Sequence, residues 1–361
     1  MSATSSARNE MNPVIPRRRG RFAEQVVVIT GASAGVGRAT ARAFAREGAR
    51  VALIARGQSG LDAARSEIER GGGQAIAIAL DVADAQALED AAERVERELG
   101  PIDIWVNNAM VTVFAPVNQI GPDEFKRVTE VTYLGGVYGA MAALKRMRTR
   151  NRGTIVQVSS ALAYRSIPLQ SAYCGAKHAL AGFVDALRCE LIHEKSRIHV
   201  TAVQMPALNT PQFSWARNKL PHHPQPVPPI FQPEVAADAI LYAASHRRRN
   251  VPVGAPTWLA EWGQRFVPGL LDKYLGRTAW GGQQTPEPDD HQRADNLFSP
   301  VDADSDPGAH GEFDARARKF SWALWTEKHR RSLGWGALAA GAMGTGLWFG
   351  ARKRKRMEGG S

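Results

Sequence analysis

Three residues near the middle of the chain have side chains suited to acid–base chemistry. Tyr173 and Lys177 are four residues apart in Ala172–Val184, where apolar residues recur at helical spacing, so both lie on one face of the expected helix. A lysine ammonium beside a phenol stabilises the phenolate and lowers its pKa towards the range of an acid–base catalyst. Ser160 follows a short apolar strand and could polarise a carbonyl oxygen. Tyr-x-x-x-Lys alone is more often an ordinary surface pair. Whether this pair is catalytic therefore depends on the elements that surround it.

Those elements alternate between apolar strands and amphipathic helices. The strands are expected at Gln25–Thr30, Val51–Ala55, Ala75–Leu80, Ile104–Val106, Thr154–Val158, His199–Val203 and Asn250–Gly254. The helices are expected at Arg38–Glu47, Leu61–Arg70, Ala85–Leu99, Pro122–Arg148, Ala172–Val184 and Pro233–Ser245. This alternation predicts an α/β fold, a Rossmann-type doubly wound parallel sheet with helices on both faces.

A glycine-rich turn joins the first strand to the first helix and reads Gly31-Ala-Ser33-Ala-Gly35-Val-Gly37. Backbone N–H groups and the helix dipole at such a junction favour a pyrophosphate, and the glycines allow the backbone to approach it closely. A lone glycine triplet is weak evidence. At the first strand-to-helix turn of a doubly wound sheet it predicts a dinucleotide site.

Taken in order, Thr30-Gly31-x-x-x-Gly35-x-Gly37, Asn107-Asn108-Ala109, Ser160 and Tyr173-x-x-x-Lys177 resemble the motifs of the short-chain dehydrogenase/reductase family. The resemblance spans roughly residues 22–245, about two thirds of the chain. It implies a nicotinamide dinucleotide and hydride transfer between an alcohol and a carbonyl. It also implies that Ser160 holds the substrate oxygen, that Tyr173 transfers the proton, and that Lys177 binds the nicotinamide ribose.

The same resemblance assigns the cofactor contacts and points to NADP(H). The expected contacts are Gly31, Ser33, Gly35, Val36, Gly37, Arg56, Asp81, Val82, Asn108, Ala109, Tyr173, Lys177, Pro206 and Thr210. NAD-preferring relatives carry an aspartate where this chain has Ala55, and the guanidinium of Arg56 suits a 2′-phosphate. Arg38 is a candidate second positive charge. Asp81 is either an adenine contact or a plain turn residue.

Two positions depart from the family pattern. Met110 stands where the family usually has glycine, which adds bulk at the end of the fourth strand. Thr132 aligns with an asparagine that holds a water linking the lysine to solvent, and a hydroxyl lacks the reach of an amide. Thr132 is therefore the uncertain fourth member of the catalytic set. These departures keep open an alternative function, a low-activity NADP-binding sensor or membrane scaffold with the same fold.

The distribution of charge and the cysteines argue against a nucleic-acid-binding, metal-binding or disulfide-rich protein. The net charge of +11 is spread over short basic runs, without zinc-finger spacing or an aromatic RNA-binding motif, so nucleic acid is not an expected partner. The two cysteines, Cys174 and Cys189, lack metal-ligand neighbours and fit a reducing compartment. No metal is expected. A small hydrophobic alcohol or ketone is the expected substrate, and the resemblance implies a homo-oligomer.

Segments outside the motifs complete the predicted organisation. Residues 1–22 are expected as a disordered basic arm, 23–282 as the catalytic domain with a substrate lid at about 205–233, and 283–318 as an acidic linker. Residues 319–361 are expected as a basic and apolar tail. The whole C-terminal extension is expected to be partly disordered. The aromatic segment Trp258–Leu275 either packs on the domain and closes the pocket or enters a membrane surface.

Within the tail, Leu333–Ala351 is nineteen residues without a charge, a possible transmembrane helix, although its many glycines and alanines make insertion marginal. We therefore expect the protein at the cytoplasmic face of a membrane, anchored by its C-terminus or bound peripherally to lipid. Otherwise it is cytoplasmic.

Overall fold

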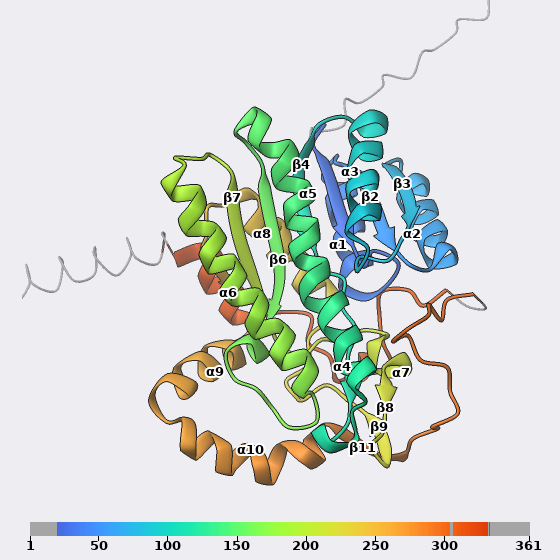
Figure 1. Cartoon of the computed structure of the whole chain (residues 1–361), viewed down its shortest axis with the longest axis vertical. Helices are drawn as coiled ribbons and strands as arrows, with labels where there is room; N and C mark the ends of the chain where they lie inside the picture. The colour runs from blue at the N-terminus through green and yellow to red at the C-terminus, as the bar shows by residue number, and fades with distance from the viewer. Residues whose placement is uncertain (1–19, 304–305, 331, 333–361) are drawn as a thin grey trace, which may run out of the picture.

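A seven-stranded parallel sheet forms the centre of the molecule (Figure 1). The computed structural model describes residues 20–303, 306–330 and 332. The strands are β1 (Val26–Thr30), β2 (Arg50–Ala55), β3 (Gln74–Ala79), β4 (Ile102–Asn107), β6 (Thr154–Ser160), β7 (His199–Met205) and β10 (Asn250–Pro252). Their order across the sheet is β10-β7-β6-β4-β1-β2-β3, in which the chain winds outwards in both directions from β1 and β4. Each strand overlaps one predicted from the sequence.

Helices cover both faces of the sheet because alternate residues of each strand point to opposite sides. Val27 and Ile29 belong to a core formed with α1 (Gly35–Arg46), α2 (Gln58–Arg70) and α8 (Pro233–Ser245). Val26 and Val28 belong to a second core formed with α3 (Ala85–Leu99), α5 (Gly135–Arg150) and α6 (Ser171–His193). The predicted doubly wound α/β fold is confirmed.

The long helix predicted at Pro122–Arg148 is interrupted. It consists of α4 (Pro122–Thr129), a π-helical turn η2 (Glu130–Leu134) and α5. Such wide turns inside helices are frequent at functional sites. Thr132, one of the two positions that depart from the family pattern, lies in this turn.

The segment after β7 crosses the carboxyl ends of the strands. It contains α7 (Gln212–Trp215), β8 (Arg217–Asn218) and β9 (His222–Pro224); β8 pairs with β5 (Val113–Phe114) and β9 with β11 (Gln284–Pro288). Two further helices, α9 (Ala255–Phe266) and α10 (Pro268–Gly282), form a hairpin below the carboxyl ends (Figure 1). The predicted lid is thus held by short strand pairs and flanked by this hairpin.

Residues 283–303 and 306–318, from the segment expected as a linker, lie against the domain instead. Leu297 is fully buried in the second core, and Arg318 donates its backbone N–H to Ile230. The acidic residues that suggested a linker meet arginines of the domain, as in the ion pair between Arg38 and Asp306. The helical residues 322–330 pack on α8, where Lys328 pairs with Asp238 at 2.8 Å.

Parts of the predicted organisation fall outside the described residues: positions 1–19 of the basic arm and the whole apolar stretch Leu333–Ala351. Across 20–303, 306–330 and 332, no helix combines the length and the apolar character needed to cross a bilayer.

Candidate active site

The glycine turn depends on a positive φ at Gly31 and on a close backbone approach at Gly37. Gly31 has a positive φ of 66°, which favours glycine, and α1 begins four residues later at Gly35. A methyl group built on Gly37 would overlap the carbonyl oxygen of Gly31, so only glycine lets the helix lie this close to the strand end. The side chain of Asn108 fixes the turn by donating a hydrogen bond of 3.0 Å to the carbonyl of Thr30.

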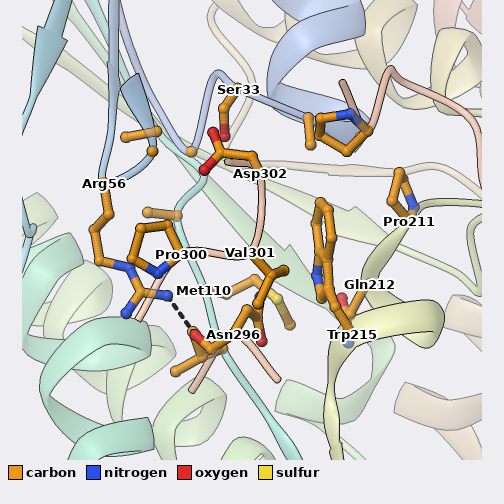
Figure 2. Close-up of a pocket in the computed structure, with 18 of the residues that line it drawn as sticks. Ser33, Arg56, Met110, Pro211, Gln212, Trp215, Asn296, Pro300, Val301 and Asp302 are labelled. Carbon is orange, nitrogen blue, oxygen red and sulfur yellow. Dashed lines mark hydrogen bonds between the residues drawn. The ribbon is translucent and has the colours of Figure 1, made fainter. Parts of the chain in front are cut away.

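A cleft opens from this turn along the carboxyl ends of β1, β2 and β4 (Figure 2). It is lined by ten of the predicted cofactor residues, namely Gly31, Ser33, Gly35, Val36, Arg56, Asp81, Val82, Asn108, Ala109 and Thr210. Gly37 packs against the carbonyl of Gly31 within the turn. Pro206, Tyr173 and Lys177 line the adjoining pocket. The crowded glycine cradle at a helix N-terminus fits the pyrophosphate of a dinucleotide.

The cleft also contains residues that sequence reasoning missed. Asn296, Pro300, Val301, Asp302 and Pro307 come from the segment expected to be a linker. The guanidinium of Arg56, expected to face a phosphate, donates to the carbonyl oxygens of Asn296 and Leu297. Arg38, the candidate second charge, is fully buried and bound to Glu67 and Asp306. Arg38 is therefore fully engaged by the protein, whereas Arg56 uses two of its five N–H groups for the segment that follows Asp295.

Asp81 has an ion-pair partner that the sequence did not suggest. Its carboxylate pairs with Arg127 of α4 and accepts the N–H of Ala83 at 3.0 Å. Asp81 shapes the turn and also lines the cleft, so its predicted contact with the adenine stays a prediction.

Ser160, Tyr173 and Lys177 are brought together at the next strand end. Ser160 closes β6, where its hydroxyl accepts the N–H of Leu162 at 3.1 Å and keeps its own proton for another acceptor. Tyr173 lies in the first turn of α6, and the ammonium of Lys177 is 5.5 Å from the centre of its ring. Lys177 is held by a 2.8 Å hydrogen bond to the carbonyl oxygen of Val158 on β6.

Burial dominates the electrostatics of this group. Burial lowers the pKa of the Lys177 ammonium to about 8. It also raises the pKa of the Tyr173 phenol above its ordinary value, and the hydrogen bond with Ser160 offsets only part of the rise. Lys177 is not among the groups that shift the Tyr173 pKa, so the lowering expected from this lysine stays a prediction for the complex with cofactor.

The hydroxyl of Thr132 is bound to the backbone of Val111. This buried hydroxyl accepts the N–H of Val111 at 3.1 Å and donates to the carbonyl of the same residue at 2.9 Å. Because a hydroxyl has one proton, this pairing leaves Thr132 no donor for a proton relay. The structure gives it a positioning contact with the segment after Met110 rather than a contact with Lys177.

Comparison with known proteins decides the family. A sequence model described as short chain dehydrogenase matches residues 25–220, more than half of the chain. The chain belongs to the short-chain dehydrogenase family. It is an oxidoreductase of this family, whose members use a nicotinamide cofactor, and its glycine turn, Ser160, Tyr173 and Lys177 all lie within the matched residues.

Relatives of this short-chain dehydrogenase include proteins with different described activities. The uncharacterized oxidoreductase YxnA of Bacillus subtilis is 29% identical over 350 residues, which covers 95% of this chain and 96% of YxnA. The fatty acyl-CoA reductase of Acinetobacter baylyi is 31% identical over 229 residues, covering 63% of this chain and 75% of that protein.

Two solved structures share the fold but differ in cofactor. A metagenomic short-chain oxidoreductase in complex with NADP has a TM-score of 0.53 and 28% identity, over 62% of this chain and 92% of that one. A short chain dehydrogenase of Mycobacterium paratuberculosis bound to NAD has a TM-score of 0.57 and 25% identity, over 64% of this chain and 97% of that one. The family therefore fixes a nicotinamide cofactor without choosing between the two.

Next to the cofactor cleft of this short-chain dehydrogenase lies an apolar pocket of about 560 Å³. Ser160, Tyr173 and Lys177 form one wall, and residues of the segment after β7 and of the α9–α10 hairpin form the others. The residues that line both spaces are Val36, Asn108, Met110, Thr210 and Gln212. The two cavities thus adjoin at Met110, the bulky departure from the family's glycine.

Proposed function

We propose that this protein is an NADP(H)-dependent oxidoreductase that interconverts an alcohol and a carbonyl on a small hydrophobic substrate. The observation that carries the proposal is the position of Ser160, Tyr173 and Lys177, on the wall of an apolar pocket that adjoins the glycine-turn cleft. A binder without chemistry would have no use for the hydroxyls of Ser160 and Tyr173 on the wall of that pocket. This favours the enzyme over the sensor or scaffold alternative.

The three side chains take distinct roles in the proposed reaction. A bound nicotinamide dinucleotide supplies or accepts the hydride. The Ser160 hydroxyl, whose proton is free of Leu162, donates a hydrogen bond to the substrate oxygen. The Tyr173 hydroxyl gives or takes the proton on that oxygen. Lys177, fixed by the carbonyl of Val158, holds a positive charge beside the phenol and binds the nicotinamide ribose.

The preference for NADP(H) rests on the end of β2. Ala55 leaves this strand end without the carboxylate that binds the ribose 2′-hydroxyl of NAD, and Arg56 places a guanidinium on the cleft wall. The NADP-bound structural relative is consistent with this preference, whereas the NAD-bound one shows that the fold accepts either cofactor.

The hydrophobic substrate is inferred from the pocket lining. Val227, Leu259, Leu271, Leu275 and Ala279 contribute apolar surface, and the volume suits a ligand of drug size or an alkyl chain. The relative described as a fatty acyl-CoA reductase supports an aliphatic substrate.

We also propose that the hairpin rests on a lipid surface at the cytoplasmic face of a membrane. Its inner side lines the pocket, while Trp262, Phe266 and Leu270 do not line it and are each more than half exposed. Exposed apolar side chains with interspersed basic ones, such as Arg265, suit the interface of an anionic bilayer. An aliphatic substrate would then enter the pocket from the lipid. A homo-oligomer is proposed from the family alone.

A screen of carbonyl substrates tests the function. Purified protein is mixed with NADPH and with aliphatic aldehydes and ketones of increasing chain length, and the loss of NADPH absorbance is followed. We expect turnover that rises with chain length until the pocket is filled, and slower turnover with NADH. No oxidation of NADPH or NADH with any carbonyl would contradict the proposed activity.

A further inference from the structure

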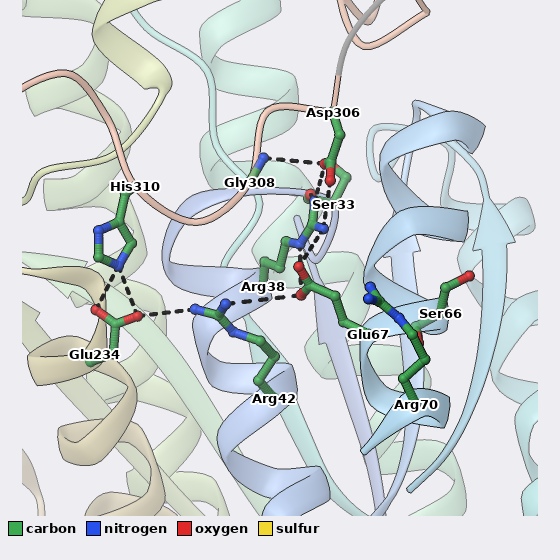
Figure 3. A network of polar contacts seen from close by, with 10 residues as sticks. All are labelled: Ser33, Arg38, Arg42, Ser66, Glu67, Arg70, Glu234, Asp306, Gly308 and His310. Atoms are coloured by element: carbon green, nitrogen blue, oxygen red, sulfur yellow. Dashed lines mark hydrogen bonds and ion pairs between the residues drawn. The ribbon is translucent and has the colours of Figure 1, made fainter. Parts of the chain in front are cut away.

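A segment of the C-terminal extension crosses the cofactor cleft at its adenosine end. We call residues 296–303 and 306–308 the strap. At one end, Asn296 and Leu297 accept hydrogen bonds from Arg56. At the other end, Asp306 pairs with Arg38 (Figure 3). The carbonyl of Gly308 accepts the N–H of Gly35 at 3.1 Å. The strap is therefore attached to both sides of the glycine turn.

Between these attachments, Asp302 points into the cleft. Its carboxylate lies beside Ser33 (Figure 2) and accepts the N–H of Gly60 at 2.8 Å. Only 8% of the residue is exposed. A methyl group built on Gly57 would overlap both carboxylate oxygens, so the close approach requires the absence of a side chain there.

The surroundings of this carboxylate form an anion site. Helix α2 begins at Gln58, and its first-turn N–H groups carry the positive end of the helix dipole. The guanidinium of Arg56 lines the same cleft. In a doubly wound dinucleotide site, the end of the second strand is where the adenosine ribose is read, either as a 2′-hydroxyl or as a 2′-phosphate.

We propose that Asp302 is a specificity-determining residue that competes with the 2′-phosphate of NADP(H) for the anion site at the N-terminus of α2. The inference rests on the proposed function in one respect, that the cleft binds a nicotinamide dinucleotide. A carboxylate and a phosphate repel each other and cannot share the same N–H donors. A 2′-hydroxyl is neutral and can donate a hydrogen bond to the carboxylate, so NAD(H) has no such competitor.

The strap therefore opposes the preference for NADP(H) that Ala55 and Arg56 create. Arg56 attracts the 2′-phosphate, and Asp302 must leave before the phosphate can reach the amides of α2. The C-terminal extension thus lowers the affinity for NADP(H) but not for NAD(H). The difference in affinity between the two cofactors becomes smaller.

The test measures binding and not turnover. Dissociation constants for NADPH and NADH are measured by fluorescence or calorimetry for the wild type and for Asp302→Asn, since the amide oxygen still accepts the N–H of Gly60 and keeps the end of α2 capped. We expect the Kd for NADPH to fall about tenfold or more and the Kd for NADH to change about twofold or less. Glu287→Gln removes the same charge from an exposed position on β11 and should change neither value.

Each other outcome has a definite meaning. If the Kd for NADPH is unchanged or rises, or if both constants fall equally, Asp302 only caps α2 or covers the cleft and the inference is wrong. If neither protein binds NADPH or NADH, the proposed function fails before the question of Asp302 arises.

A second measurement on the wild type does not depend on the variant. Hydrogen exchange of a peptide covering residues 298–303 is compared with saturating 2′,5′-ADP and with 5′-AMP, which differ at the 2′ position. We expect faster exchange with 2′,5′-ADP, because the phosphate displaces the carboxylate. Equal exchange with both nucleotides would overturn the proposal.

Discussion

Lys177 lies with its ammonium 5.5 Å from the centre of the Tyr173 ring, one helical turn further along α6. Lys177 as a whole is 3% exposed, and its ammonium is bound to the carbonyl of Val158. The lysine is thus fixed by β6 and directed at the phenol, in an environment that disfavours its charge.

Replacing Lys177 by methionine should stabilise the fold at neutral pH while removing activity. Because burial lowers the lysine pKa from 10.5 to about 8, the unfolded chain binds a proton more tightly than the folded chain. The variant should gain about 3 kcal/mol in the free energy of unfolding below pH 8, and the gain should shrink as pH rises from 8 to 10.5. Urea unfolding at several pH values measures this.

The exposed Lys126→Met variant is the control for that series and should show no comparable pH dependence. A Lys177→Met variant that loses stability at pH 7 would mean that the buried ammonium is better compensated than its surroundings indicate.

Gly37→Ala should damage the cofactor cleft and the fold together. Its new methyl group overlaps the carbonyl of Gly31, so α1 must move away from the turn. We expect a loss of roughly 2 kcal/mol or more in stability and weaker dinucleotide binding. Gly182→Ala on α6 has open space around the added methyl group and should be neutral or stabilising. Thermal melts and a cofactor titration compare the two, and equal effects would refute the crowding argument.

The exposed face of the hairpin predicts binding to lipid. A variant with both Trp262→Ser and Phe266→Ser should bind anionic vesicles at least about tenfold more weakly, because two large apolar side chains no longer enter the interface. Ile192→Ser, on an exposed position at the far end of α6, is the control. Cosedimentation of the full chain with vesicles compares the binding of the wild type and both variants. Unchanged binding of the double variant would show that the hairpin does not contribute to lipid binding.

The sequence predicted most of the sheet because its strands are continuous apolar runs between turn signals. The third helix, Ala85–Leu99, was predicted with the bounds that the structure gives it. The π-helical turn around Thr132 was missed, since periodicity does not show a local widening of a helix. The helix beginning at Ser171 likewise continues to His193, beyond its predicted end.

The strap could not be found from local patterns. Its acidic and proline-containing composition is that of a linker, and its partners are far away in the sequence: Arg38 and Asp306 are 268 residues apart. Arg56 lies on the cleft wall, where its contact with a 2′-phosphate stays a prediction, and its hydrogen bonds to Asn296 and Leu297 depend on the packed fold. The motif thus predicted where the site lies, and only the tertiary structure revealed what else occupies it.

The central claim, that Tyr173 transfers the proton, is tested most directly by Tyr173→Phe. With NADPH and the best carbonyl substrate, we expect kcat to fall by about 1000-fold while the Kd for NADPH changes by about twofold or less. Tyr164→Phe removes a hydroxyl that is bound to Gln204 instead, and it should retain turnover. A Tyr173→Phe enzyme with wild-type kcat would contradict the account.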